Sequence, residues 1–477
     1  MSMVANFSLW KFLLRYYLFF IAVPFVATNV FFVLGVTFGI PLSDEWRWVK
    51  ELLIPLHRNE ISVFEYLTGE YAFLSHSHYL ALLFLWFDFE WLDLNFNYFT
   101  YAGVVFYVLA YGAILLYLKE NLQKDLCVNI AALLILSVGY FCITSDFPWL
   151  LVVFEYVYFF IAIITLLVLD SFLQGRSRLP LLSFTLLGCL LLADTIGMAA
   201  VFLSVIVLFA NALFVREKRK AFFVVVAIIT LFFSLQYFWF GAGIGGSPHS
   251  RIDTLFVLLR NPTDVLISFM SIFSQPLVDI NILRFIGGEY YAPVLQFVLG
   301  VCGFILTSCV CYCYLKSDGL KKSQLPLIFI GYSILIWALI FISRYQDYGV
   351  SVMDEPRYVR LFTLIYVGVA VAFLCMVHTV KTRKLLYCAA AALVLSYSGT
   401  VIFKYWQDQY IESYFMDARV ELIKEPVDSA ALAIYIGRCA NDYCVEALDF
   451  MKENQLSIFK DQNVSQNKTQ VEKPVLQ

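Results

Sequence analysis

Long apolar runs recur along the chain from near the N-terminus to about residue 403, separated by short polar connections. A helix needs about 20 predominantly apolar residues to cross the hydrocarbon core of a bilayer. Backbone groups inside lipid must bond within their own segment, so such runs are expected to be helical. The pattern predicts an all-α polytopic membrane protein with about eleven spans, at 13–40, 99–118, 126–144, 149–172, 180–193, 197–214, 221–240, 293–315, 325–343, 359–380 and 385–403.

Two of these spans are short and adjacent. Residues 180–214 are too many for one crossing, and polar or flexible positions at Asp194, Thr195 and Gly197 interrupt them. We expect two short helices that turn at Asp194, with the turn shielded from lipid by protein or facing water.

Lysine and arginine positions orient the predicted spans. Cytoplasmic connections of membrane proteins are enriched in these residues. With the spans above, six basic clusters fall on one side, which is therefore assigned to the cytoplasm. They contain Lys11 and Arg15; Lys119 and Lys124; Arg176 and Arg178; Arg216, Lys218, Arg219 and Lys220; Lys316, Lys321 and Lys322; and Lys381, Arg383 and Lys384.

The opposite side receives the long connections. These are 41–98, 241–292, 344–358 and the tail 404–477, so the predicted domains are a membrane part, 1–403, and a small tail. Both long loops hold apolar stretches too short to span, for which we expect amphipathic helices at the membrane surface. The tail is polar enough to be disordered from about residue 463. Tryptophans are expected at headgroup depth in the first loop: Trp46, Trp48, Trp86 and Trp91.

Composition agrees with a membrane protein. The chain is 61% hydrophobic and 14% charged, whereas a soluble domain carries roughly 25% charged residues. No basic block indicates nucleic-acid binding. Nine of the eleven cysteines lie in or beside apolar runs, where they serve as small packing residues. The other two, Cys439 and Cys444, lie in the polar tail and could form a disulfide in an oxidising compartment.

An acidic pair, Asp44-Glu45, follows the first predicted span on the outer side. Two adjacent acids there can be solvated turn residues. They can also act in sugar transfer, which passes through an oxocarbenium-like state that a nearby carboxylate stabilises. We assign Asp44 as the base for an acceptor hydroxyl. Glu45 would orient it or bind a divalent cation.

Two histidines, His76 and His78, lie later in the same loop. A zinc site usually needs three or four ligands, and no third ligand is evident, so we predict no metal site here. Interfacial polar packing is one interpretation. In the other, His78 binds or protonates a phosphate oxygen, which an imidazole can do near neutral pH.

Arginines at the outer ends of two spans depart from the positive-inside pattern. Arg344 ends one span, and Arg357-Tyr358 and Arg360 precede the next. A guanidinium binds phosphate through two parallel hydrogen bonds, so converging arginines suit a lipid-linked phosphate. The alternative is pairing with neighbouring acids, namely Asp347, Asp354 and Glu355.

Three isolated acids are further candidates for an outer cavity. Glu155 lies inside a predicted span, Asp194 at its outer turn, and Asp146 near the outer mouth. An ionisable residue in a membrane helix usually has a function, although protonated or paired acids also occur there.

Taken together, these motifs resemble the GT-C superfamily of polyprenyl-phosphate-sugar-dependent glycosyltransferases, and most closely the bacterial O-antigen serotype-converting glucosyltransferases. That group often shows Asp-Glu-Trp after helix one, a later Asn-Glu-His-Arg-like segment, and an arginine followed some dozen residues on by Arg-Tyr. The counterparts here are Asp44-Glu45-Trp46, Ser75-His76-Ser77-His78, and Arg344 with Arg357-Tyr358. Tyr79 stands where the family pattern has arginine, which weakens the case for a phosphate contact there.

The resemblance implies a multi-pass enzyme of the bacterial inner membrane with a cytoplasmic N-terminus and a periplasmic C-terminus. It would move a sugar, by family glucose, from undecaprenyl phosphate to O-antigen or another lipid-linked glycan. In this picture Asp44 is the base, and Arg344, Arg357, Tyr358 and His78 hold the phosphate. A separate donor synthase and a flippase would supply the donor, and the lipids of the membrane surround the chain.

Two other functions remain open. An O-antigen polymerase would also place arginines outside, but we would expect its essential residues in two large loops. A transporter or flippase of lipid-linked sugar would place charged residues near the middle of the bilayer. Glu155 is the best candidate for such a pathway.

Overall fold

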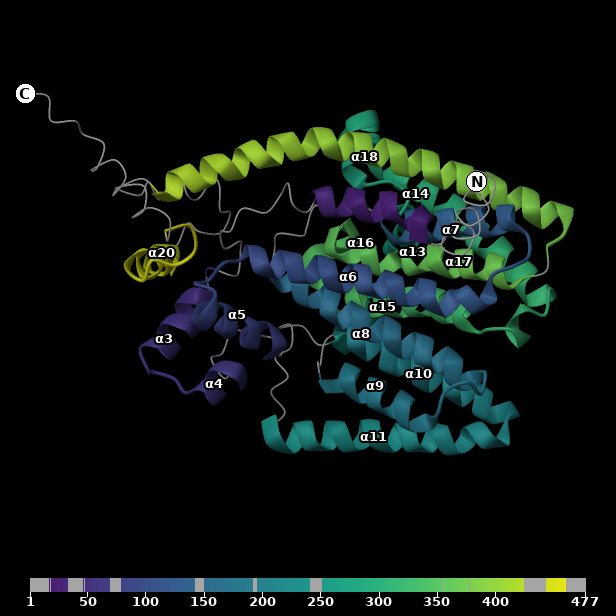
Figure 1. The fold of residues 1–477 in the computed structure, drawn as a ribbon, viewed down its shortest axis with the longest axis horizontal. Coiled ribbons are helices and arrows are strands. Elements are labelled where there is room, and N and C mark those ends of the chain that lie inside the picture. Colours follow the sequence, from purple (N-terminus) through teal and green to yellow (C-terminus); the bar gives the residue numbers. More distant parts are fainter. Residues whose placement is uncertain are drawn as a thin grey trace, which may run out of the picture. The chain divides into compact units, whose positions relative to one another are not determined.

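The computed structural model describes residues 17, 19–32, 46, 48–68, 79–141, 150–191, 195–240, 251–354, 356–376, 378–423 and 443–459. Every regular element in these ranges is helical, which confirms the all-α prediction (Figure 1). The chain forms two compact units. The first comprises residues 1–31, 107–144 and 158–404, and the second comprises 32–106, 145–157 and 405–477.

Long helices build the first unit. Three of its elements belong to it only in part: it holds the larger parts of α6 (Asn97–Leu118) and α8 (Leu150–Leu173) and the first part of α18 (Val380–Ile423). The elements that lie wholly within it are η2 (Lys119–Asn121), α7 (Leu126–Tyr140), α9 (Leu179–Leu191), α10 (Thr195–Phe214), α11 (Arg216–Phe240), α12 (Arg251–Arg260), α13 (Pro262–Ser274), α14 (Ile280–Lys316), η3 (Gly319–Lys321), α15 (Leu325–Tyr348), η4 (Gly349–Asp354), α16 (Pro356–Phe362) and α17 (Leu364–Cys375).

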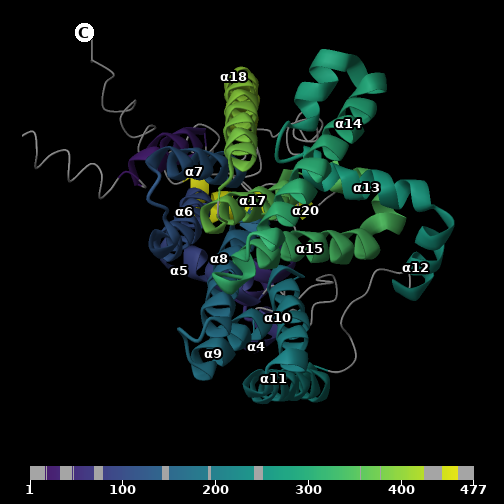
Figure 2. The same cartoon turned by 90° about the vertical axis from the view of Figure 1, so that its right-hand side faces the viewer.

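Seven described helices are long and apolar enough to cross a membrane, or eight if the bent pair α12 and α13 counts as one span. Shorter apolar helices cover Phe19–Phe32, Leu126–Tyr140 and Leu179–Leu191. The chain is therefore a multi-pass membrane protein by helix length and composition. Helix α17 is the central element, because all of its residues are buried and it packs against α7, α14 and α15 (Figure 2).

The region 180–214 forms two helices, α9 and α10, as the polar interruption predicts. Asp194 itself lies outside the described residues. The two helices approach closely at Gly197, where an added Cβ would lie 2.7 Å from the carbonyl oxygen of Cys189. A glycine is required at this contact because no other side chain fits.

The segment 255–273 differs from its prediction as an amphipathic surface helix. It forms α12 and α13, which meet at an angle of 95°. Residues 268 and 270–274 of α13 are buried. Two glycines of α14 explain this: added Cβ atoms on Gly300 and Gly303 would lie 2.2 Å and 2.9 Å from the carbonyl oxygens of Met270 and Phe273. Small residues let two helix backbones touch, so α13 packs into the helical bundle.

Replacing Gly300 with alanine is expected to destabilise the protein by about 1–3 kcal/mol, because the new methyl group forces α13 and α14 apart. The melting temperature of the protein in detergent measures this effect. The matched control is Gly112→Ala in α6, where nothing lies within 4 Å of the new Cβ. This control should be neutral or slightly stabilising. Equal melting temperatures for Gly300→Ala and the wild type would contradict the close helix contact.

The second unit joins the first long loop to the C-terminal region. It contains η1 (Val49–Leu53), α3 (Ile54–His57), α4 (Val63–Thr68), α5 (Tyr79–Trp91), α20 (Tyr443–Glu453) and η5 (Ser457–Phe459). Glu446 of α20 lies 3.3 Å from Lys50 Nζ and 3.6 Å from Arg58 Nη1. The His57 ring contacts the ring of Phe450. These contacts hold residues 48–58 and 443–459 side by side (Figure 1).

The tryptophans of this loop divide into two groups. Trp46 and Trp48 are each 1% exposed, so their side chains form part of the interior of the second unit. By contrast, Leu83, Phe87 and Trp91 are exposed at a spacing of four residues along α5. That spacing places them on one helix face, as expected for a helix whose apolar side lies on a membrane surface.

Asp88, on α5, is the buried carboxylate of this unit and is 1% exposed. Neither of its carboxylate oxygens has a hydrogen-bond partner of good geometry among the described residues. Burial raises the pKa of Asp88 to about 7, and the charge of Asp93 adds to the rise. The backbone N–H of Asn95 is near enough to offset this slightly. Asp88 therefore takes up its proton near neutral pH.

The stability of the protein should depend on pH through Asp88. The native state holds this proton more tightly than the unfolded chain, whose carboxyl pKa is near 3.8. Stability should therefore fall by up to about 4 kcal/mol as the pH rises from about 4 to about 7. The variant Asp88→Asn stays neutral, so its melting temperature should change less over that range.

Asp449→Asn, an exposed acid on α20, is the matched control and should behave like the wild type. Identical pH dependence in wild type and Asp88→Asn would rule out Asp88 as the titrating group.

Candidate functional site

The structure describes part of the predicted site. Asp44, Glu45, His78, Asp146, Asp194 and Cys439 lie outside the described residues. Cys444 lies in α20, and Arg357 in α16, but the structure does not describe their side chains. Glu155 is half-buried on α8 in the second unit. Arg344 and Tyr358 are both described and both belong to the first unit.

The segments that carry the predicted arginines lie together at one end of the first unit. Arg344 is half-buried on the last turns of α15, and α16 begins at Pro356. The chain reverses between them at Gly349, whose φ of 62° and ψ of −146° suit glycine. Element η4 then packs against α13 and α15, and α16 packs against both α13 and α15. The structure thus packs α16, which carries Arg357, against α15, which carries Arg344, and Ser333 Oγ of α15 donates to the Leu361 carbonyl oxygen at 2.9 Å.

Within α16 the side chain of Arg360 is 1% exposed and that of Tyr358 is 9% exposed. A buried guanidinium is costly unless anions or several hydrogen-bond acceptors surround it. The sequence pattern gave more weight to Arg357 than to Arg360. The signal for Arg360 was its spacing of three residues from Arg357, which places both on adjoining parts of one helix face.

A further acid, Asp264, joins this end of the unit. Its Oδ2 accepts a hydrogen bond of 2.5 Å from the hydroxyl of Tyr345, the residue after Arg344. Asp264 lies in the first turn of α13, just after the 95° bend at Asn261. No local sequence pattern marks Asp264, because its partner is 81 residues away in the chain.

A buried ion pair also lies in the first unit. Lys404 Nζ is 2.8 Å from Asp279 Oδ2, and Lys404 is 1% exposed. Asp279 also caps α14, because its Oδ1 accepts the backbone N–H of Asn281 at 2.8 Å. A cavity of about 10 Å³, large enough for about one water molecule, lies beside this pair and is lined in part by Gln275 and Tyr397. The sequence signal for this pair was a lysine at the predicted outer end of a span.

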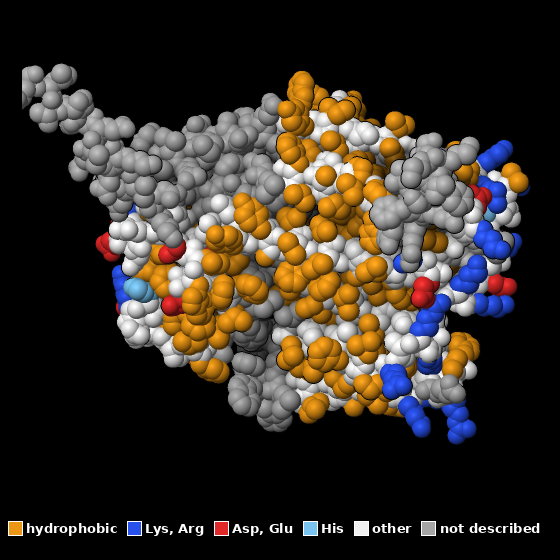
Figure 3. All heavy atoms as spheres, viewed as in Figure 1, with side chains coloured by type: hydrophobic (Ala, Val, Ile, Leu, Met, Phe, Trp, Pro, Cys, Tyr) orange, Lys and Arg blue, Asp and Glu red, His pale blue; other side chains and the backbone are white. Residues whose placement is uncertain are grey.

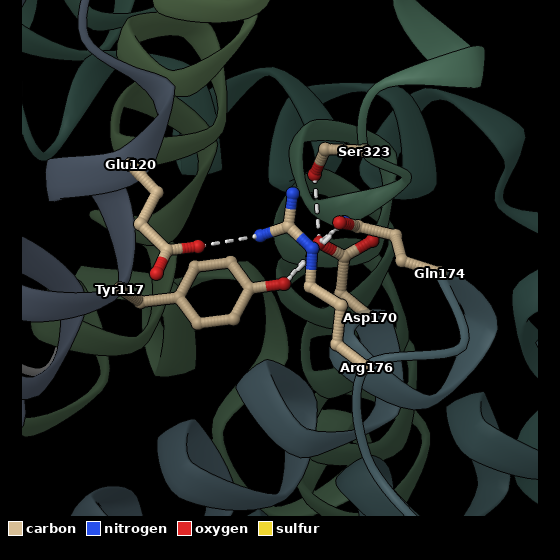
Figure 4. A network of polar contacts seen from close by, with 6 residues as sticks. All are labelled: Tyr117, Glu120, Asp170, Gln174, Arg176 and Ser323. Carbon is tan, nitrogen blue, oxygen red and sulfur yellow. Dashed lines mark hydrogen bonds and ion pairs between the residues drawn. The ribbon is translucent and has the colours of Figure 1, made fainter.

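The opposite end of α15 carries a different polar cluster, centred on Asp170 (Figure 4). Its Oδ2 accepts hydrogen bonds from Tyr117 Oη at 2.7 Å, Gln174 Nε2 at 2.6 Å and Ser323 Oγ at 2.7 Å. Its Oδ1 accepts the backbone N–H of Gln324 at 2.6 Å. With these donors in place, Asp170 is a structural clamp between α6, α8 and the start of α15. The sequence analysis did not select it.

The two ends are well separated. Along α15, Tyr345 follows Leu325, which lies next to the Asp170 cluster, by twenty residues. At 1.5 Å per residue this is roughly 30 Å, about the thickness of a hydrocarbon core. The arginine-bearing end and the Asp170 end are therefore separated by a distance that matches a membrane crossing.

The arginine-bearing end carries cationic side chains, for which an anion is the chemically suitable ligand. Among the described residues, no group of three or more histidine, cysteine or acidic side chains could hold a metal ion. Arginines held on packed helix ends suit a phosphate group, to which a guanidinium donates two parallel hydrogen bonds. Comparison of the chain with protein-family models, curated proteins and solved structures found no match.

Proposed function

We propose that the protein is a membrane glycosyltransferase that moves a sugar from a polyprenyl phosphate to a lipid-linked glycan outside the cytoplasm. The observation that carries this proposal is the packing of α16, which holds Arg357, Tyr358 and Arg360, against α15, which holds Arg344 near its end. Arginines at the ends of apolar helices lie at the depth where the phosphate of a lipid-linked sugar enters.

The proposed reaction is a single displacement. The hydroxyl oxygen of the acceptor attacks the anomeric carbon of the sugar, and the bond from that carbon to the phosphate oxygen breaks. Asp44 takes the hydroxyl proton, and polyprenyl phosphate leaves with the bonding electrons. Arg344 and Arg357 stabilise the negative charge of the leaving phosphate. The donor sugar, by resemblance glucose, and a divalent cation at Glu45 are parts of this proposal.

The orientation is also part of the proposal: eleven spans, with the N-terminus in the cytoplasm and the C-terminus in the periplasm of a bacterium. Residues 48–58 and 443–459 pack together, so an even number of crossings must separate them. The predicted topology has ten spans between these segments. The packing of the second unit therefore supports the prediction of an even number of crossings between these segments.

The test of the function is charge reversal at the arginines. Arg344→Glu and Arg357→Glu should each reduce sugar transfer by a hundredfold or more in membranes supplied with polyprenyl-linked sugar and a lipid-linked acceptor. Arg344→Lys should retain part of the activity, because it keeps the charge and loses the two parallel hydrogen bonds.

Arg284→Glu is the matched control. Arg284 is an exposed arginine of α14 that pairs with Glu289 at 3.2 Å, so its reversal should leave transfer near the wild-type rate. Full transfer by Arg344→Glu at normal protein levels would mean that Arg344 only pairs with nearby acids.

A further inference from the structure

A second anion-binding feature lies in the first unit, at the end that carries the Asp170 cluster. Four connections between helices surround a cavity of about 700 Å³ that opens to solvent. They are η2 with the residues before α7, the residues after α8, η3 with the residues before α15, and the turn between α17 and α18. Five basic side chains line the cavity: Lys124, Arg176, Lys321, Lys322 and Arg383. Figure 3 shows lysines and arginines gathered at this end.

Acids neutralise part of this charge. Arg176 Nη1 lies 3.0 Å from Glu120 Oε2 (Figure 4), and Arg383 Nη1 lies 3.3 Å from Asp125 Oδ2. Lys321 Nζ lies 3.1 Å from Asp318 Oδ1, and both side chains are exposed. Lys124 and Lys322 have no acid within ion-pair distance in the described part of the chain. The five bases and three acids leave a net charge of +2 at the cavity.

Hydrogen bonds in the cavity wall reduce the partial negative charge of the carbonyl groups there. The carbonyl groups at the end of a helix lack helical partners and carry a partial negative charge. At the end of α17, Gln123 Nε2 donates to the carbonyl oxygens of Phe373, Leu374 and Met376 at 3.1, 2.9 and 2.8 Å. His378 Nε2 lies 2.7 Å from the Phe373 carbonyl oxygen and donates to it. These bonds leave few free acceptors to repel an anion.

Two polar atoms of the lining have no hydrogen-bond partner in the described part of the chain. They are Asn121 Nδ2, a donor, and His378 Nδ1. Buried polar groups nearly always have a partner, so either atom could take one without giving up another hydrogen bond. Both atoms are enclosed by protein, so an anion would accept from Asn121 Nδ2 only after this side chain turns toward the cavity, and it would favour a proton on His378 Nδ1.

The cavity also lies where helices that are apolar enough to span a membrane end or begin. The apolar helices that end beside it do so at Asn121 and Cys375, and the next begins at Val380. Basic pockets between membrane helices at this depth bind phosphate-bearing headgroups. The lining includes Leu122, Leu374 and Met376 beside the charged residues. A volume of several hundred Å³ fits a ligand larger than a single phosphate ion.

We propose that this cavity is a binding site for a phosphate monoester or diphosphate group, separate from the arginine-bearing end roughly 30 Å away along α15. Lys124 and Lys322 supply the charge, and Asn121 Nδ2 donates to a phosphate oxygen. The phosphate belongs either to an anionic lipid headgroup or to a soluble phosphate compound, and both sources offer the same group to these residues.

The test uses the purified full chain in a neutral detergent, with dioctanoyl phosphatidic acid as the probe and dioctanoylglycerol as its uncharged counterpart. Titration calorimetry should show binding of the phosphatidic acid alone. The double variant Lys124→Gln with Lys322→Gln should bind it roughly thirtyfold more weakly, about fivefold for each lysine. Both lysines are exposed, so the variant should keep the wild-type melting temperature.

The matched control removes two charges from the same end without touching the cavity: Arg216→Gln with Lys220→Gln, both exposed on the first turns of α11. Its affinity should stay within about twofold of the wild type.

Inorganic phosphate that displaces the probe at millimolar concentration would identify a soluble phosphate compound as the source, and no displacement would identify a lipid headgroup. Either result supports the site. Absence of phosphatidic acid binding, equal affinity in the Lys124 and Lys322 variant, or equal loss in the control would overturn it.

Discussion

Replacing Asp170 with alanine is expected to destabilise the protein by about 3–5 kcal/mol. The substitution removes the common acceptor of Tyr117 Oη, Ser323 Oγ and the backbone N–H of Gln324. Each buried donor that is left without an acceptor destabilises the folded state by about its desolvation penalty, which is about 1–3 kcal/mol. The melting temperature in detergent, measured with the wild type in parallel, should fall by many degrees.

Two further variants sharpen this prediction. Asp170→Asn keeps one acceptor oxygen, but its amide N–H₂ faces groups that also donate. The stability of this variant should therefore lie between that of Asp170→Ala and that of the wild type. Asp318→Ala removes an acid at the same end whose pairing with Lys321 is solvent-exposed, and should change stability by less than about 1 kcal/mol. If Asp170→Ala and the Asp318→Ala control have the same melting temperature, the hydrogen bonds of Asp170 contribute nothing to stability.

Replacing Asp44 with asparagine is expected to reduce sugar transfer by a factor of about 10²–10⁴. Asparagine has nearly the same size as aspartate but cannot accept the proton of the acceptor hydroxyl, so binding of the donor should change little. The measurement is transfer of labelled sugar from polyprenyl phosphate to a lipid-linked acceptor in isolated membranes, with protein levels matched to the wild type.

Glu45→Gln is the neighbouring control for this variant. A residue that orients Asp44 should reduce transfer less than Asp44 itself, and a residue that holds a divalent cation should make the wild-type rate sensitive to EDTA. Unchanged transfer in Asp44→Asn, at protein levels matched to the wild type, would remove Asp44 as the base.

The sequence by itself determined the class of the protein. Apolar runs near 20 residues long can only satisfy their backbone groups as helices in lipid, so the all-α membrane fold follows from local composition. The same local reasoning predicted the break between α9 and α10, because a polar residue and a glycine interrupt an apolar run that is too long for one span. The clustering of lysines and arginines at one end also follows from the chain alone.

Only the tertiary structure decided which residues meet. The pairs Asp264 with Tyr345 and Asp279 with Lys404 join positions 81 and 125 residues apart, and no local pattern encodes such contacts. Burial was likewise decided by packing: α13 enters the bundle because Gly300 admits its backbone, and Trp48 is enclosed within the second unit. Hydropathy gives the preference of a segment for an apolar environment. The surfaces of the other helices determine where in the fold that segment packs. For that reason the sequence predicted the arginines as a motif, and the fold brought the helices that carry them together.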